Sequence, residues 1–129
     1  VHSHLSMASN WMKQQQNSMD AEGAAYDYFG RRRVFDNPYK IRNFAVQSPA
    51  SLVCLHKLVL LIEALEGIAN VCMHIHDGYV ISVKNDNLVK TYEITKRILE
   101  SENELYPGLR LQVGCERGTN LNQLVSYSP

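Results

Sequence analysis

Hydrophobic residues recur at helical spacing in three segments of the chain, residues 5–22, 49–66 and 85–101. In the middle segment, apolar residues stand at positions 52, 55, 59, 62 and 65, and few polar residues interrupt them. We therefore expect a mostly buried helix there, with a proline in its first turn. Gly23 and Gly67 follow the first two segments, where glycine commonly ends a helix. The pattern predicts three helices.

Alternation of apolar and polar residues predicts a β-hairpin between residues 71–76 and 79–83. Asp77-Gly78 separates the two segments, and this dipeptide is typical of a two-residue hairpin turn. Such a turn would pair His76 with Tyr79 and leave the aspartate exposed at the tip. The face expected to enter the core consists of Met73, Ile75 and Val80.

Two further patterns complete the predicted elements. Residues 24–28 and 31–35 flank Phe29-Gly30 and predict a second, shorter hairpin. Residues 109–113 alternate after a turn at 106–108, and we expect them to form a third strand beside the Asp77 hairpin. The order of elements predicts an α+β fold, in which a small, mainly antiparallel sheet is backed by helices.

Length and composition exclude several classes of protein. The chain has 129 residues, enough for one compact domain, and 45% of them are hydrophobic. Thirteen basic residues balance thirteen acidic ones, which excludes a histone-like polyanion binder but leaves room for a local basic patch. The three cysteines form no C-x-x-C pair, so a disulfide framework or structural zinc site is not expected and a reducing compartment is favoured.

The chain shows no secretory or membrane-spanning pattern. Its longest uninterrupted apolar runs, such as residues 58–62, are far shorter than the ~20 residues that cross a bilayer. The first four residues include no methionine and no signal-peptide pattern. We interpret the chain as a soluble piece of a longer protein without a membrane partner.

The densest group of chemically versatile side chains is His74-Ile75-His76-Asp77. An aspartate at a tight turn is common for purely structural reasons, because aspartate tolerates the turn conformation. The functional interpretation is a carboxylate held on a rigid hairpin for a divalent cation, and Mg²⁺ uses few protein carboxylates. A zinc site built on His74 and His76 is a further alternative, although no third ligand pattern lies nearby.

A basic segment precedes the long central helix. It could simply be a solvated charge run. Alternatively, the amides of Asn43 and Gln47, four residues apart, could read acceptors in a nucleic-acid minor groove. The cations of this segment are Arg31, Arg32, Arg33, Lys40 and Arg42.

The order of these elements resembles the C-terminal half of the palm of a family A DNA polymerase, more closely the phage-type members. The family shows a G-R-R element, an N-x-x-x-Q pattern before a long helix, a His-Asp hairpin and a closing G-x-N. Here these correspond to residues 30–33, 43–47, 76–77 and 118–120. The resemblance covers about residues 10–125. It implies a partial palm domain over the whole chain, in which residues 1–23 lead in from the fingers side and residues 24–129 form the palm.

The resemblance also implies a function, namely DNA synthesis by two-metal nucleotidyl transfer from a dNTP to a primer 3′-hydroxyl. Asp77 would be a catalytic carboxylate that binds Mg²⁺, and His76 would lie near the primer terminus. Asn43 and Gln47 would contact the minor groove of the primer–template DNA. The candidates for further DNA contacts, mainly with backbone phosphates, are Arg31, Arg32, Arg33, Lys40 and Arg42.

The sequence departs from the family pattern in three ways. Gly78 stands where the family has a glutamate after His-Asp, and Tyr39 stands where an arginine is common. The N-terminal palm aspartate and the nucleotide-binding fingers helix are absent from this chain. We therefore expect it to be inactive alone and to need the missing portion or a partner subunit, in the cytoplasm of a bacterial or phage-infected cell or in an organelle. The alternatives are a non-catalytic nucleic-acid-binding or scaffold piece and the palm of a single-subunit RNA polymerase.

Overall fold

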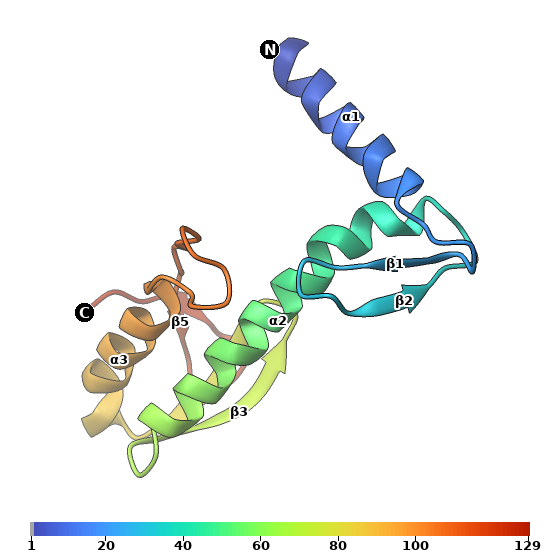
Figure 1. The fold of residues 1–129 in the computed structure, drawn as a ribbon. Helices are drawn as coiled ribbons and strands as arrows, with labels where there is room; N and C mark the ends of the chain where they lie inside the picture. The colour runs from blue at the N-terminus through green and yellow to red at the C-terminus, as the bar shows by residue number, and fades with distance from the viewer. Residues whose placement is uncertain (1) are drawn as a thin grey trace. The chain divides into compact units, whose positions relative to one another are not determined.

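A computed structural model describes residues 2–129 of the chain, with side chains from Ser6 onward. This part contains three α-helices and three two-stranded antiparallel sheets, so the predicted α+β class is confirmed (Figure 1). The strands of the described residues do not join into the single sheet that was predicted. The chain forms two compact units, residues 1–52 and 53–129. The elements are α1 (His2–Asn17), β1 (Ala24–Tyr26), β2 (Arg32–Val34), α2 (Lys40–Ala64), β3 (Ala69–Ile75), β4 (Gly78–Val83), α3 (Leu88–Glu100), β5 (Glu116–Arg117) and β6 (Val125–Ser126).

The first unit contains the shorter predicted hairpin, which is confirmed. Strands β1 and β2 pair from Ala24 opposite Val34 to Tyr26 opposite Arg32. Helix α1 ends at Asn17, earlier than predicted, because the chain then turns toward β1. The small core of this unit consists of Ala25, Phe35 and Ile41, with Met19 and Phe44 packed against them.

Helix α2 begins at Lys40, nine residues before the predicted start at Pro49. The backbone N–H of Tyr39 donates to the Asn37 side chain (2.9 Å), and the N–H of Lys40 donates to the Asn37 carbonyl (3.1 Å). These bonds organise the entry to the helix. Pro49 therefore lies inside α2 rather than in its first turn. A proline removes one backbone hydrogen bond there, and the surrounding turns continue the helix.

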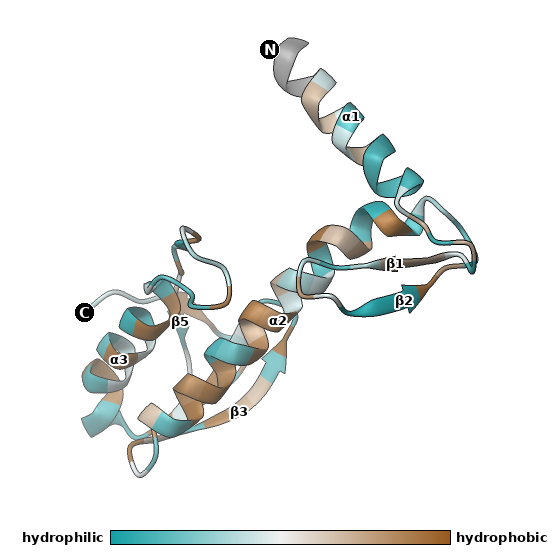
Figure 2. Ribbon diagram, viewed as in Figure 1, coloured by the Kyte–Doolittle hydropathy of each residue, from teal (hydrophilic) through white to brown (hydrophobic). Residues whose placement is uncertain are grey.

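The expectation that this helix is mostly buried is wrong. Leu55, Val59 and Ile62 lie on one stripe of α2 and remain 44–54% exposed. Figure 2 shows the hydrophobic colour over the second half of the helix. By length and composition α2 could cross a membrane, although core helices of soluble proteins pass the same test. Only 22% of its most apolar stretch is buried.

The second unit contains the hairpin β3–β4, whose turn differs by one residue from the prediction. Ile75 pairs with Gly78, so His76 and Asp77 are the two turn residues and Gly78 begins β4. His76 adopts a left-handed backbone conformation with φ of 55°. The predicted pairing of His76 with Tyr79 is therefore wrong, while the exposed position of Asp77 at the tip is confirmed.

The predicted core face of this hairpin is buried only in part, because Val80 is half-buried while Met73 and Ile75 are exposed. Met73 and Ile75 are 42% and 50% exposed. The other face is half-buried, with the rings of His74 and Tyr79 stacked at 5.1 Å. The Tyr79 hydroxyl donates to the carbonyl of Cys54 in α2 (2.7 Å), and burial raises the pKa of this hydroxyl. This anchoring bond explains why the polar face turns toward the helix.

The predicted helix after the hairpin is confirmed as α3, preceded by one 3₁₀ turn at Asn85–Asn87. The predicted strand at residues 109–113 is absent from the described chain. The N–H of Val113 instead donates to the Glu100 carboxylate (3.2 Å). Alternation alone does not make a strand, because a strand also needs a neighbouring edge with which to pair. The sequence reasoning missed the terminal hairpin β5–β6, in which Glu116 pairs with Ser126.

Candidate nucleic-acid interface

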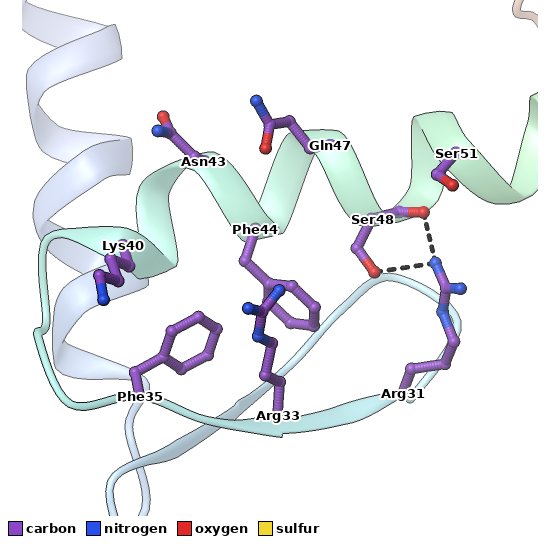
Figure 3. A pocket seen from close by; sticks show the side chains of 9 residues that line it. All are labelled: Arg31, Arg33, Phe35, Lys40, Asn43, Phe44, Gln47, Ser48 and Ser51. Atoms are coloured by element: carbon purple, nitrogen blue, oxygen red, sulfur yellow. Dashed lines mark hydrogen bonds between the residues drawn. The ribbon is translucent and has the colours of Figure 1, made fainter. Parts of the chain in front are cut away.

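The first unit holds a cavity of about 430 Å³ between the β1–β2 hairpin and the first half of α2 (Figure 3). It combines cations, amides, hydroxyls and two aromatic rings. Five of the seven DNA-contact candidates from the sequence line it; Arg32 and Arg42 do not. The lining residues are Arg31, Arg33, Phe35, Lys40, Asn43, Phe44, Gln47, Ser48 and Ser51.

Two amide side chains form the exposed rim of this cavity. Asn43 and Gln47 lie one helical turn apart on α2 and project in the same direction in Figure 3. Both are exposed, and their amides form no hydrogen bond with the described residues. An α-helix places residues i and i+4 on one face, so both amides are available to one ligand.

Two neighbouring arginines of the basic segment, Arg32 and Arg33, have different surroundings. Arg32 forms ion pairs with Glu22 and, at 3.5 Å, with Asp20 on the unit's surface. Arg33 forms no ion pair within the described chain, and its guanidinium lies over the Phe35 ring at 5.5 Å. Strand alternation separates the two side chains, so Arg33 contributes a positive charge to the cavity and Arg32 does not.

The two cations at the start of α2 also differ. Lys40 lines the cavity, and its ammonium pairs with the Asp36 carboxylate at 2.8 Å. Such an exposed pair is weak, so the ammonium can exchange it for another anion. Arg42 donates to the Gln16 side chain of α1 at 2.8 Å and lies over the Tyr39 ring. Arg42 therefore stands apart from the cavity.

The sequence reasoning missed a buried carboxylate beneath the hairpin turn. The Asp27 side chain accepts hydrogen bonds from the backbone N–H groups of Phe29 and Arg31 (both 2.9 Å) and from the Ser48 hydroxyl (2.6 Å). It also pairs with the Arg31 guanidinium at 2.8 Å. Burial raises the pKa of this carboxyl, but the hydrogen bonds from Ser48 and Arg31 outweigh it and lower the pKa to about 2. The D-x-x-G-R spacing was the available signal.

This pKa predicts a specific acid sensitivity of the first unit. The folded-state pKa of Asp27 lies below the usual 3.8, so its contribution is complete above about pH 4. As the pH falls toward 2, we expect roughly 2 kcal/mol of stability to be lost. Amide hydrogen exchange of β1 and β2 between pH 5 and pH 2 measures this loss. In Asp27→Asn the acid-dependent step should vanish; an unchanged step would contradict the assignment.

The second unit places His76 and Asp77 together at the exposed tip of the β3–β4 turn. No group of three or more potential metal-ligating side chains occurs among the described residues. Asp77 alone offers the hard oxygen that Mg²⁺ prefers, so a magnesium ion there needs further carboxylates from elsewhere. A zinc site is not supported, because His74 stacks on Tyr79 while His76 lies in the turn.

The closing G-x-N segment, residues 118–120, lies in the turn between β5 and β6. A side chain on Gly118 would clash, because its Cβ would lie 2.2 Å from the carbonyl oxygen of Gln123. The glycine is therefore required by the close approach of the backbone at this turn.

Comparison with models of known protein families gives no match for this sequence, and comparison with curated proteins gives none either. The cavity brings together an amide pair and cations on one unit, and the hairpin presents one free carboxylate on the other.

Proposed function

We propose that this chain is the C-terminal palm segment of a template-directed DNA polymerase. In this proposal the first unit binds the primer–template duplex and the second supplies one catalytic carboxylate. The observation that carries the proposal is the amide pair Asn43 and Gln47, exposed on one face of α2 at the rim of a cation-lined cavity. The ordered sequence motifs add to it.

The amide pair suits the minor groove of DNA. The N3 and O2 acceptors of the bases occupy similar positions for all base pairs, and an amide N–H can donate to them without selecting a sequence. Arg33 and Lys40 line the same cavity and would neutralise the flanking phosphates. The combination suits a protein that holds a duplex of any sequence.

The catalytic part of the proposal concerns the β3–β4 turn. Asp77 would hold one of two Mg²⁺ ions, with further ligands from outside this chain, and His76 would face the primer terminus. The ions would activate the 3′-hydroxyl and stabilise the departing pyrophosphate of the dNTP. A tight two-residue turn gives the carboxylate a defined position, which metal binding requires.

A non-catalytic role as a DNA-binding or scaffold piece is the second candidate. It is favoured by the lone carboxylate at the turn, since Gly78 replaces the glutamate of the family pattern. The two candidates share the duplex interface and differ only in the role of Asp77.

A binding experiment tests the shared interface. For the double variant Asn43→Ala, Gln47→Ala, we expect about tenfold weaker binding of a fluorescent primer–template duplex, because two hydrogen bonds are lost. Neither substitution alters the charge of the protein, so the salt dependence of the duplex affinity should stay the same. Helix α1 carries a matched control, because Asn10 and Gln14 are also exposed and four residues apart. Equal effects of the two double variants, or no binding by the unmodified chain, would refute the interface.

The charge component is tested with Arg33→Ala. We expect weaker binding and a salt slope that is smaller by about one, because one phosphate contact is lost. Arg97→Ala, an exposed arginine in α3, serves as the charge-matched control. Fluorescence anisotropy at several salt concentrations gives both slopes; identical slopes for the two variants would exclude Arg33 from phosphate binding.

A further inference from the structure

The guanidinium of Arg31 is engaged within the protein, although this residue lines the cavity. It pairs with the buried Asp27 carboxylate at 2.8 Å. It also donates to the Ser48 hydroxyl at 2.8 Å and to the Ser48 carbonyl, as the dashed lines of Figure 3 show. The Ser48 hydroxyl in turn donates to Asp27 at 2.6 Å. Each of the three side chains thus contacts the other two. We call this group the Asp27–Arg31–Ser48 triad.

The triad joins the turn of the β1–β2 hairpin to α2 at the residue directly after Gln47. Pro49 follows Ser48, and its missing N–H leaves the carbonyl of Ala45 without its helical donor. The helix therefore lacks one backbone hydrogen bond at this point. The bonds from Arg31 to both the side chain and the backbone of Ser48 stabilise the helix at the same place.

We propose that Asp27, Arg31 and Ser48 are positioning residues that hold the Asn43–Gln47 face of α2 in its binding orientation. In this role Arg31 acts through Ser48 and does not itself bind a phosphate. The Nε–H of Arg31 bonds the buried Asp27 carboxylate and its Nη2 bonds Ser48, so the planar fork of the guanidinium joins Asp27 and Ser48. The inference rests on the proposed duplex interface, because it names what orients that interface.

The direction in which duplex affinity changes in Asp27→Asn and Arg31→Lys distinguishes this role from phosphate binding. If Arg31 bound a phosphate, Asp27→Asn would strengthen duplex binding by removing a negative charge, and Arg31→Lys would keep most of the affinity. As a positioning group, the triad predicts weaker binding in both variants, by roughly tenfold, with an unchanged salt slope. Ser48→Ala should weaken binding similarly, and Ser48→Thr should restore it, because threonine keeps the hydroxyl.

The decisive experiment combines duplex affinity with amide hydrogen exchange of α2 in these four variants. We expect faster exchange around residues 43–52 in Asp27→Asn, Arg31→Lys and Ser48→Ala, with α3 as the internal reference. Tighter binding by Asp27→Asn, or normal exchange in all variants, would overturn the inference. If the unmodified chain binds no duplex, the proposed function fails, while the exchange data still decide whether the triad holds α2.

Discussion

Replacing Asp77 with alanine is expected to abolish primer extension by an enzyme assembled from this chain and the palm and fingers portion that the proposal requires. A carboxylate that binds a catalytic metal ion supplies several kcal/mol of transition-state stabilisation, so we expect a loss of about 10³-fold or more. Raising the Mg²⁺ concentration should not restore the rate, because the ligand itself is missing. Single-turnover extension of a labelled primer measures the effect.

Asp86 provides the matched control for this experiment. It is also exposed and lies nine residues further along the chain, in the 3₁₀ turn before α3. Asp86→Ala should extend primers at the normal rate. If Asp77→Ala retained extension, the metal-binding role would be wrong, and the non-catalytic candidate would gain support provided that duplex binding persisted.

Replacing Lys57 is expected to destabilise the second unit strongly. Lys57 is 5% exposed, and its ammonium donates to the carbonyls of Ile98 (2.6 Å) and Ser101 (2.9 Å) and to the Ser101 hydroxyl (2.7 Å). It thereby joins α2 to the C-terminal end of α3, where helix carbonyls lack partners and favour a cation. Burial lowers the pKa of this ammonium.

Lys57→Met keeps the length of the side chain and removes only the ammonium. We expect the opening free energy of α3 to fall by about 2 kcal/mol, because the two carbonyls lose a charged donor in a partly buried place. Amide hydrogen exchange within α3 measures this change directly. Lys90→Met, at an exposed position of α3 itself, is the control and should have little effect. Equal exchange in the two variants would show that the buried ammonium contributes nothing.

The pattern of the sequence predicted which elements form and where most of them lie. The hairpin around Phe29-Gly30, the helix over residues 88–100 and the hairpin that carries Asp77 all depend on local signals: alternation, glycine turns and helical spacing. Local signals did not predict the start of α2, because Pro49 suggested a first turn and the capping bonds from Asn37 lie outside the apolar pattern. They also failed at residues 109–113, which pair with no strand among the described residues.

The residues of the candidate site were likewise predicted only in part from the sequence. The sequence indicated Asn43 and Gln47 as an amide pair four residues apart, but placed both before the helix. Their common helical face follows only from the structure, in which α2 begins at Lys40. The different partners of Arg31, Arg32 and Arg33 could not be predicted from the sequence. A run of like charges does not indicate which guanidinium pairs with a buried carboxylate.

By itself, then, the sequence determined the α+β class and the exposure of Asp77 at a turn, because these follow from residues close together in the chain. Only the tertiary structure decided that Asp27 is buried, that Arg31 bonds Ser48, and that the His74–Tyr79 face of its hairpin turns toward α2. Each of these joins residues 17 or more positions apart. The free energy of such contacts depends on burial and on partner geometry, which no local pattern encodes.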